Sequence, residues 1–213
     1  FMRNWDSLAN NDILGNNWNG DICPQEVDYL DAKKVADKLG IPLLRVDFIK
    51  EYWDYVFTHF IEEYKKGRTP NPDVLCNREI KFKDFKQKAL ELGADYIATG
   101  HYSRITYNKE SGRYLIIRPE DVKKDQTYVL WQLSQHQLAH TLMPLGELTK
   151  DEVRQIAQDY ELASASAKDS QDICFVPNGD YAEFIQAQQG TAFPKGKYVD
   201  INGKTLGEHL GHQ

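Results

Sequence analysis

The chain has 213 residues, of which 41% are hydrophobic and 27% charged, and this ordinary balance excludes wholesale disorder and collagen-like repeats. No stretch approaches 18 consecutive apolar residues, and the first basic residue is not followed by an apolar signal segment, so a membrane partner is not predicted. The net charge of −6 argues against a general nucleic-acid coat, and three scattered cysteines argue against a disulfide scaffold and predict a reducing, cytoplasmic location.

The first hundred residues predict alternating helices and strands. Phe1-Met2 is typical of the end of a buried strand. Apolar periodicity predicts helices at 24–39, at 50–66 and from about 74 to 92, with short strands at 43–48 and 96–99. The alternation is typical of an α/β layer with a parallel sheet, in which ligands gather at the carboxyl ends of the strands. Asp47 and Gly100-His101 follow such strands.

One stripe of apolar side chains, three and four residues apart, runs along the helix at 50–66. We interpret it as core rather than as a cofactor site. The stripe consists of Trp53, Val56, Phe57, Phe60, Ile61 and Tyr64. Inward-facing residues are also expected on the next helix, at Ile80, Phe82, Phe85 and Ala89.

The second half predicts hairpins at 104–118 and, around Asn202-Gly203, at 197–208. Between them, helices are predicted at 126–133 and 135–142, from the capping residue Thr149 to about Leu162, and at 180–188. A run of small residues at 163–168 is typical of a linker. We therefore predict one α/β domain at 1–163 and the beginning of a second domain at 164–213.

Cys76 lies where a proline-rich loop becomes a helix. The partial positive charge of a helix N-terminus lowers the pKa of a thiol, and Arg78 and Lys81 add positive charge, so the sequence predicts a substantial thiolate. A buried structural cysteine explains the residue equally well. Cys174, in a short apolar run, is by itself typical of a strand cysteine. The two thiols could meet as attacking and resolving partners.

Positive charge concentrates at residues 64–88, where eight Lys and Arg face three acids. That excess suits a polyanion, although a solvated helix face is the simpler interpretation. Lys124-Asp125-Gln126 precedes an apolar segment: Asp125 is a natural N-cap, whereas Lys124 and Gln126 could reach a base-bearing partner. No Cys-x-x-Cys, His-Glu-x-x-His or glycine-rich phosphate loop is present, so no protein-bound metal is predicted.

Taken together, these segments resemble the tRNA 2-thiouridylase family. The resemblance rests on the runs GRTPNPDVLCNREIKF (67–82) and GADYIATGHY (93–102), on KDQ (124–126) and on the Cys174-Phe175 segment. It implies an α/β fold: an incomplete parallel-sheet, adenine-nucleotide α-hydrolase-like (N-type ATP pyrophosphatase) domain, followed by the start of a small central β-rich domain.

The resemblance also implies a function. Such enzymes convert the wobble uridine of tRNA to 2-thiouridine: ATP, with Mg²⁺ as its counter-ion, adenylates the 2-oxygen, and a cysteine persulfide delivers sulfur from a sulfur-relay donor protein. On this sequence, Cys174 would hold the persulfide and Cys76 would help to release its sulfur, through a Cys76–Cys174 disulfide. The base must leave its stack, so recognition of a single-stranded anticodon loop is expected.

Further site residues follow from the same resemblance. Asp73 would handle protons beside the target base, with Asn71 and Pro72 lining it. The tRNA contacts would come from His101, Lys124, Asp125 and Gln126. Met2 and Gly100 would border the adenine nucleotide.

The family's Ser-Gly-Gly-x-Asp-Ser loop, first strand and first helix, and C-terminal β-barrel are not in this sequence, so we expect the chain alone not to adenylate. Two other functions compete: a dithiol redox protein using Cys76 and Cys174, and a non-catalytic RNA-binding module. The 68–73 loop argues against the first, because a redox pair needs no base-reading turn. The two thiols argue against the second, because RNA binding needs neither.

Overall fold

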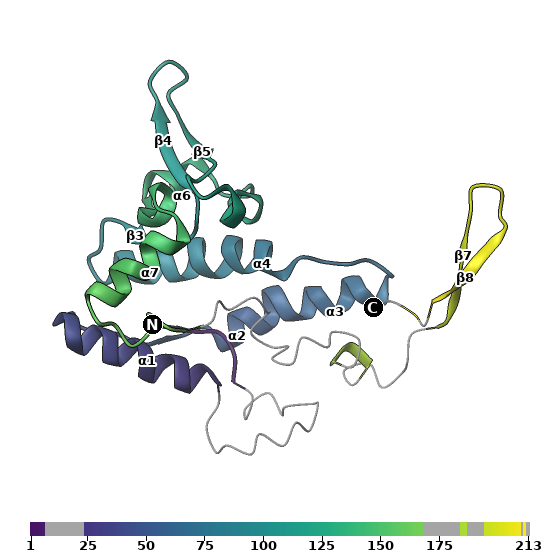
Figure 1. The fold of residues 1–213 in the computed structure, drawn as a ribbon, viewed down its shortest axis with the longest axis horizontal. Helices are drawn as coiled ribbons and strands as arrows, with labels where there is room; N and C mark the ends of the chain where they lie inside the picture. The colour runs from purple at the N-terminus through teal and green to yellow at the C-terminus, as the bar shows by residue number, and fades with distance from the viewer. Residues whose placement is uncertain (7–23, 168–183, 187–193, 210, 212–213) are drawn as a thin grey trace.

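The computed structural model describes residues 1–6, 24–167, 184–186, 194–209 and 211. Helices and strands alternate in the first half, and hairpins and short turns dominate the second (Figure 1). In chain order the elements are β1 Met2–Arg3, α1 Pro24–Leu39, β2 Val46–Asp47, α2 Ile49–Tyr52, η1 Trp53–Phe57, α3 Thr58–Lys65, α4 Pro72–Leu75, η2 Cys76–Phe85, α5 Lys86–Glu91, β3 Ile97–Ala98, β4 Arg104–Asn108, β5 Arg113–Ile117, η3 Val122–Lys124, η4 Thr127–Val129, α6 Gln135–Ala139, β6 Thr141–Leu142, η5 Pro144–Glu147, α7 Lys150–Asp159, β7 Gly196–Val199 and β8 Thr205–His209.

Two long helices occupy the centre of the molecule, and each contains a π-helical segment (Figure 1). The first runs without a break through α2, η1 and α3, which confirms the helix predicted at 50–66. The second runs through α4, η2 and α5, and begins at Pro72, two residues before the predicted start. Asn71 explains the earlier start, because its side-chain oxygen accepts from the N–H groups of Asp73 and Val74 at 3.0 and 3.3 Å. Proline at the first helical position needs no donor.

The parallel pairing predicted for the α/β layer is present in two short ladders. Strand β1 pairs with β2 through Met2 and Val46, and β3 pairs with β6 through Ile97 and Thr141. Among the described residues these pairs form separate two-stranded sheets, and the strands are shorter than predicted. Both predicted hairpins are confirmed, as β4–β5 and β7–β8.

The helix predicted at 126–133 is wrong, and the one at 135–142 is partly wrong. The first segment holds only a 3₁₀ turn, at Thr127–Val129. The second ends at Ala139, after which β6 pairs with β3 through hydrogen bonds from Ile97 to the His140 carbonyl and from Thr99 to the Leu142 carbonyl. These long-range ladder bonds outweigh a weak local helix preference. Of the short helix predicted at 180–188, only residues 184–186 are described, and they are helical.

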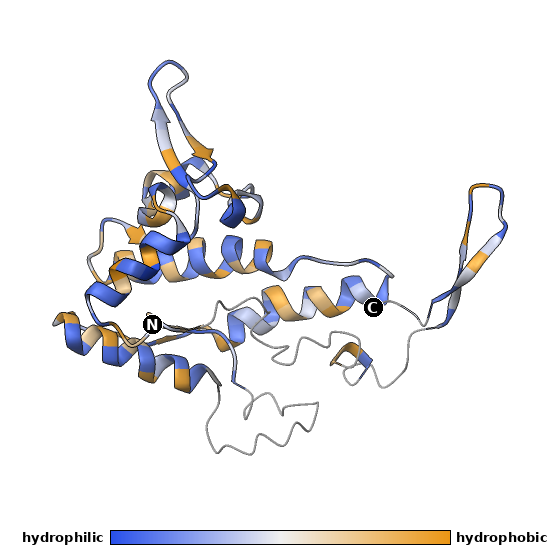
Figure 2. Ribbon diagram, viewed as in Figure 1, coloured by the Kyte–Doolittle hydropathy of each residue, from blue (hydrophilic) through white to orange (hydrophobic). Residues whose placement is uncertain are grey.

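Among the described residues, two buried clusters form the core. The first joins α2, η1 and α3 to η2 and contains the predicted aromatic stripe, which is therefore confirmed as core: Trp5, Phe48, Tyr52, Val56, Phe57, Phe60, Cys76, Ile80, Phe184 and Ile185. The second lies under the β4–β5 hairpin: Phe82, Ile97, Val129, Leu130, Leu133 and Leu138. Figure 2 shows the apolar bands that the long helices contribute. Within the described parts of the chain, no helix combines the length and the apolar character that crossing a bilayer requires.

Candidate functional site

The 68–73 loop leads into the second long helix, which begins at Pro72. Asn71 and Asp73 are exposed, whereas Pro72 is buried. The Asn71 side-chain oxygen is occupied by its two capping bonds, so only the amide nitrogen of this side chain is left to meet a ligand. Of the predicted base-facing residues, Asp73 therefore presents an exposed carboxylate and Asn71 an exposed amide nitrogen. Its charge also acts on Cys76, one turn further along the helix.

Cys76 is the fifth residue of the continuous helix and only 7% exposed. Its N–H is bonded within the helix, to the Pro72 and Asp73 carbonyls, so it does not sit among the open N–H groups of the helix end. Burial raises the pKa of the Cys76 thiol, with Lys81 opposing and Asp73 reinforcing the shift. The predicted thiolate at neutral pH is therefore wrong for this structure: desolvation exceeds the favourable charge.

The other predicted sulfur atom, in Cys174, lies outside the described residues, as does Cys23. The meeting of Cys76 with Cys174 accordingly stays a prediction. The described residues Phe184 and Ile185, which follow Cys174 in the chain, belong to the same buried cluster as Cys76.

His101 is buried behind the second long helix. Its Nδ1 lies 3.0 Å from the Thr99 hydroxyl, and its ring centroid is 5.8 Å from that of Phe82. Burial, with a smaller contribution from the positive charge of Lys81, lowers the pKa of His101 to about 4. The imidazole is therefore neutral at physiological pH, and any contact it makes with RNA is that of a neutral hydrogen-bonding group.

Lys81 links these observations, because its ammonium group lowers the pKa of both Cys76 and His101. The sequence indicates Lys81 only as a charge near Cys76 and as one of the cations at residues 64–88. Its second neighbour, His101, comes from a segment twenty residues further on, and only the tertiary structure reveals it.

Two predicted tRNA-contacting segments are held together by Gln126. Its side-chain oxygen accepts from the Tyr102 N–H at 2.9 Å, and its own N–H donates to the Tyr102 carbonyl at 3.0 Å. Asp125 accepts from the N–H and hydroxyl of Thr127 and from Arg118 at 2.7 to 2.9 Å. Asp125 and Gln126 thus shape the loop beside His101, which places the 100–102 and 124–126 segments at one site.

The predicted nucleotide neighbours follow different strands. Met2 lies in β1 and packs against the first core cluster, whereas Gly100 is exposed and lies two residues after the end of β3. At the carboxyl end of β1, the buried Asn4 side-chain oxygen has no hydrogen-bond partner. A buried free acceptor fits a donor such as the amino group of adenine. In the described ranges, no group of three or more His, Cys, Asp or Glu could hold a metal ion.

Comparison with known proteins agrees with the resemblance inferred from the motifs. Residues 1–178 match the family described as tRNA methyl transferase HUP domain. The chain is 58% identical over 214 aligned residues to the tRNA-specific 2-thiouridylase MnmA of Mycoplasma capricolum, an alignment that covers 99% of the chain and 56% of that relative. It is 51% identical to tRNA-specific 2-thiouridylase MnmA 1 of Geobacillus kaustophilus, covering 99% of the chain and 54% of the relative.

The chain thus spans about half the length of the curated relatives that it matches. The family match covers both the parallel strand pairs and the two long helices described above. The chain therefore belongs to the tRNA methyl transferase HUP-domain family.

Proposed function

We propose that this chain forms the uridine- and sulfur-handling part of an ATP-dependent tRNA sulfurtransferase that makes 2-thiouridine at the wobble position. The observation that carries the proposal is the 58% identity, over 99% of the chain, to a protein named tRNA-specific 2-thiouridylase. The structure adds support, because the 68–73 loop leads into the long helix that carries Cys76, and His101 of the Gln126-linked loops lies against Phe82 of the same helix.

In the proposed reaction, ATP with Mg²⁺ as counter-ion would supply the activation that turns the uridine 2-oxygen into a leaving group. Cys174 would carry the transferable sulfur as a persulfide. The Cys76 sulfur would bond to the Cys174 sulfur while the persulfide S–S bond breaks. The released sulfur would bond to C2 of the uracil while the bond between C2 and the activated 2-oxygen breaks, and that oxygen would leave as part of AMP. The sulfane sulfur is reduced, and two thiols are oxidised to a disulfide, which an external thiol must reduce before the next turnover.

Burial of Cys76 would make substrate binding precede deprotonation of the thiol. The thiol has a raised pKa and little exposure, so it would be protected and protonated until the substrate arrives. Asp73, exposed one turn before it, would accept the thiol proton, and Lys81 would stabilise the thiolate. Cys76 also begins the π-helical segment η2, and such segments are frequent at functional sites. Burial argues against a dithiol redox function, because thiol–disulfide exchange needs an accessible thiolate.

The partners follow from the same proposal. The tRNA would present its extruded wobble base to Asn71, Pro72 and Asp73, and its anticodon loop to the segments that hold His101 and Lys124-Asp125-Gln126. Met2 and Gly100 would border the adenine nucleotide, with Asn4 as a further acceptor. A sulfur-relay protein would load Cys174, and the reaction would take place in the cytoplasm. We place the linker between the two proposed domains, 1–163 and 164–213, at residues 163–168.

A chimeric enzyme tests the proposal. This chain would replace the aligned segment of the Mycoplasma capricolum relative, in cells that lack their own 2-thiouridylase, and tRNA 2-thiouridine would be measured by mass spectrometry. We expect 2-thiouridine with the unaltered chain, and its loss with Cys76→Ser or Cys174→Ser while tRNA affinity is retained. Cys23→Ser is the matched control. Absence of 2-thiouridine from a folded chimera would refute the function, and full thiolation by the Cys76→Ser chimera would refute the role of Cys76.

A further inference from the structure

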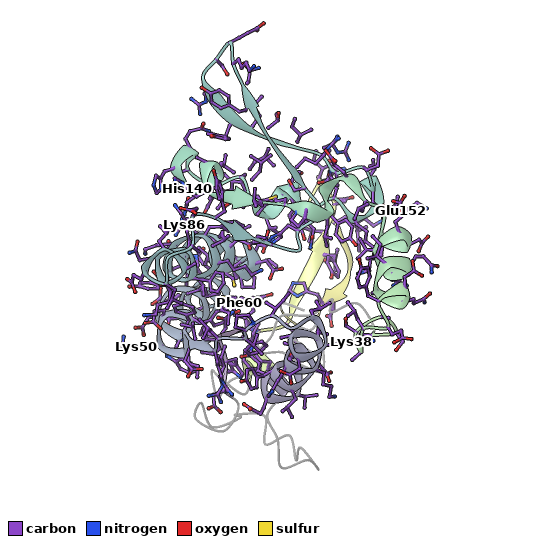
Figure 3. All side chains as sticks on the ribbon, turned by 90° about the vertical axis from the view of Figure 1, so that its left-hand side faces the viewer. Lys38, Lys50, Phe60, Lys86, His140 and Glu152 are labelled. Atoms are coloured by element: carbon purple, nitrogen blue, oxygen red, sulfur yellow. The ribbon has the colours of Figure 1, made fainter. Side chains whose placement is uncertain are left out.

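A pocket of about 280 Å³ lies between the second long helix and α6, beyond the residues assigned so far. The polar side chains that line it are those of Lys83, Lys86, Gln87, Ser134, His136 and Gln137, and no acidic side chain lines it. Figure 3 shows Lys86 and His140 at this edge of the molecule, where the helices meet the hairpin layer.

Lys86 is the unusual member of this group. It is only 4% exposed, and its ammonium donates to His136 Nδ1 at 2.9 Å and, at a longer 3.5 Å, to the His136 carbonyl. Within the described residues it has no carboxylate partner, and burial lowers its pKa. Buried charges in proteins are ordinarily paired, because taking an unpaired ion out of water costs several kcal/mol. A buried lysine that has no counter-ion among the described residues is therefore a candidate to bind an anion.

The hydrogen bonds determine which groups can meet that anion. An ammonium group has only donors, so His136 Nδ1 accepts from Lys86 and His136 Nε2 carries the ring proton. His140 donates its Nδ1–H to the His136 carbonyl at 2.8 Å, and its ring lies 4.6 Å from that of His136. Among the described residues, the third N–H of Lys86 has no acceptor, and His136, which is exposed, presents its Nε2–H.

A further feature favours an anion. The Ser134 oxygen accepts from the Gln137 N–H at 3.3 Å, which leaves the Ser134 O–H to donate. Lys83, at the rim, is not counted as a free cation, because its ammonium is paired with Glu79 at 2.7 Å. Hydrogen-bond donors from α5 and from the start of α6 thus line one pocket, and no carboxylate lines it.

We propose that this pocket binds a phosphate group of the tRNA backbone, with Lys86 as its buried cation and His136 as a second donor. The inference rests on the proposed function, which supplies the RNA. The site positions the RNA without reading its sequence, because phosphate contacts carry no base information. The proposal also gives a role to one of the cations at residues 64–88. Most of the others are paired with Glu63, Glu79 or Glu91.

The test compares Lys86→Met with Lys88→Met in the full chain. Lys88 lies on the same helix but is exposed and paired with Glu91. Binding of unmodified tRNA would be measured as a function of salt, together with binding of inorganic phosphate and the urea midpoint of unfolding. For Lys86→Met we expect about tenfold weaker tRNA binding, since a hydrogen bond to a charged group is lost, and a salt slope smaller by about one phosphate contact. Lys88→Met should leave the slope unchanged.

Stability separates a binding role from a structural one. Removal of a buried, unpaired cation should keep or raise the urea midpoint, whereas loss of a structural contact should lower it. Because Lys86→Met could disturb the core, His136→Ala provides a second variant: its side chain is exposed, and we expect several-fold weaker tRNA binding from it.

Unchanged tRNA affinity and salt slope in both variants would overturn the proposal. Loss of inorganic phosphate binding with tRNA binding intact would overturn it as well, since the pocket would then serve a free phosphate. A failure of the proposed function is seen separately, as a chimera that makes no 2-thiouridine.

Discussion

The Phe184 ring packs edge-on against Phe57, with the ring centroids 6.0 Å apart and the planes at 81°. This contact brings the later part of the chain to the buried cluster that contains Cys76. Cys174 precedes Phe184 by ten residues, a length that reaches at most about 35 Å when extended. This length is sufficient for the proposed encounter of the two sulfur atoms, which stays a prediction.

Substitution of Phe184 should make the Cys76 thiol more accessible to solvent, because both residues belong to the same buried cluster. Phe184 is 2% exposed, and Phe→Ala changes in a core typically cost about 3–5 kcal/mol. We expect Phe184→Ala to lower the free energy of unfolding by about that amount and to speed alkylation of Cys76 by iodoacetamide, followed by mass spectrometry of the Cys76 peptide. Tyr198→Ala, at a 60% exposed hairpin position, is the control. Equal alkylation rates in the two variants would show that Phe184 does not shield the thiol.

The free energy of unfolding should decrease as the pH is lowered, because the unfolded chain protonates His101 more readily than the folded chain does. Its pKa is about 4 in the folded state and about 6.5 when unfolded, so the unfolded chain binds the proton more readily. Stability is fully present above pH 6.5 and is lost as the pH falls toward 4, by at most about 3 kcal/mol for this shift.

Urea unfolding at pH 7 and at pH 4.5 measures this effect. His101→Asn removes the titrating group and should flatten the difference in unfolding free energy between the two pH values. The exposed His59, changed to Asn, should leave that difference as it is. A pH dependence that survives in the His101→Asn variant would have to come from other groups.

The cap at Asn71 can be separated from its proposed role at the uridine. Asn71→Ala removes the acceptor for the Asp73 and Val74 N–H groups and should destabilise the chain by about 1 kcal/mol. Asn71→Asp keeps a capping oxygen and should retain stability. Thermal unfolding of both variants measures the difference. If the aspartate chimera folds but makes less 2-thiouridine, the amide has a role in the reaction beyond the cap.

Gly146 permits a close backbone approach under the β4–β5 hairpin. A Cβ at this position would overlap the Ser103 carbonyl, which cannot move freely because it is main chain. We expect Gly146→Ala to destabilise by about 1–3 kcal/mol, as overpacking does. At Gly100 a Cβ would have only an ordinary contact, 3.8 Å from Leu145, so Gly100→Ala should leave the urea midpoint unchanged. Reduced ATP binding by a fully stable Gly100→Ala chimera would then support the proposed nucleotide role of Gly100.

The amino-acid sequence by itself determined the local elements. Apolar periodicity located the helices at 24–39 and 50–66, and the Asn202-Gly203 pair located the last hairpin. Its motifs also led to the family, because an ordered run of residues carries that information without any geometry. These features depend on neighbouring residues, and a linear chain displays neighbours directly.

Tertiary structure decided the environment of each group. Burial, which depends on side chains distant in sequence, raises the pKa of Cys76 where the helix N-terminus alone predicted a lower value. Pairing with β3 turned Thr141–Leu142 from predicted helix into strand. Folding likewise brought Lys86 against His136, fifty residues away. Desolvation and long-range hydrogen bonds are properties of the folded surroundings, so local sequence patterns do not display them.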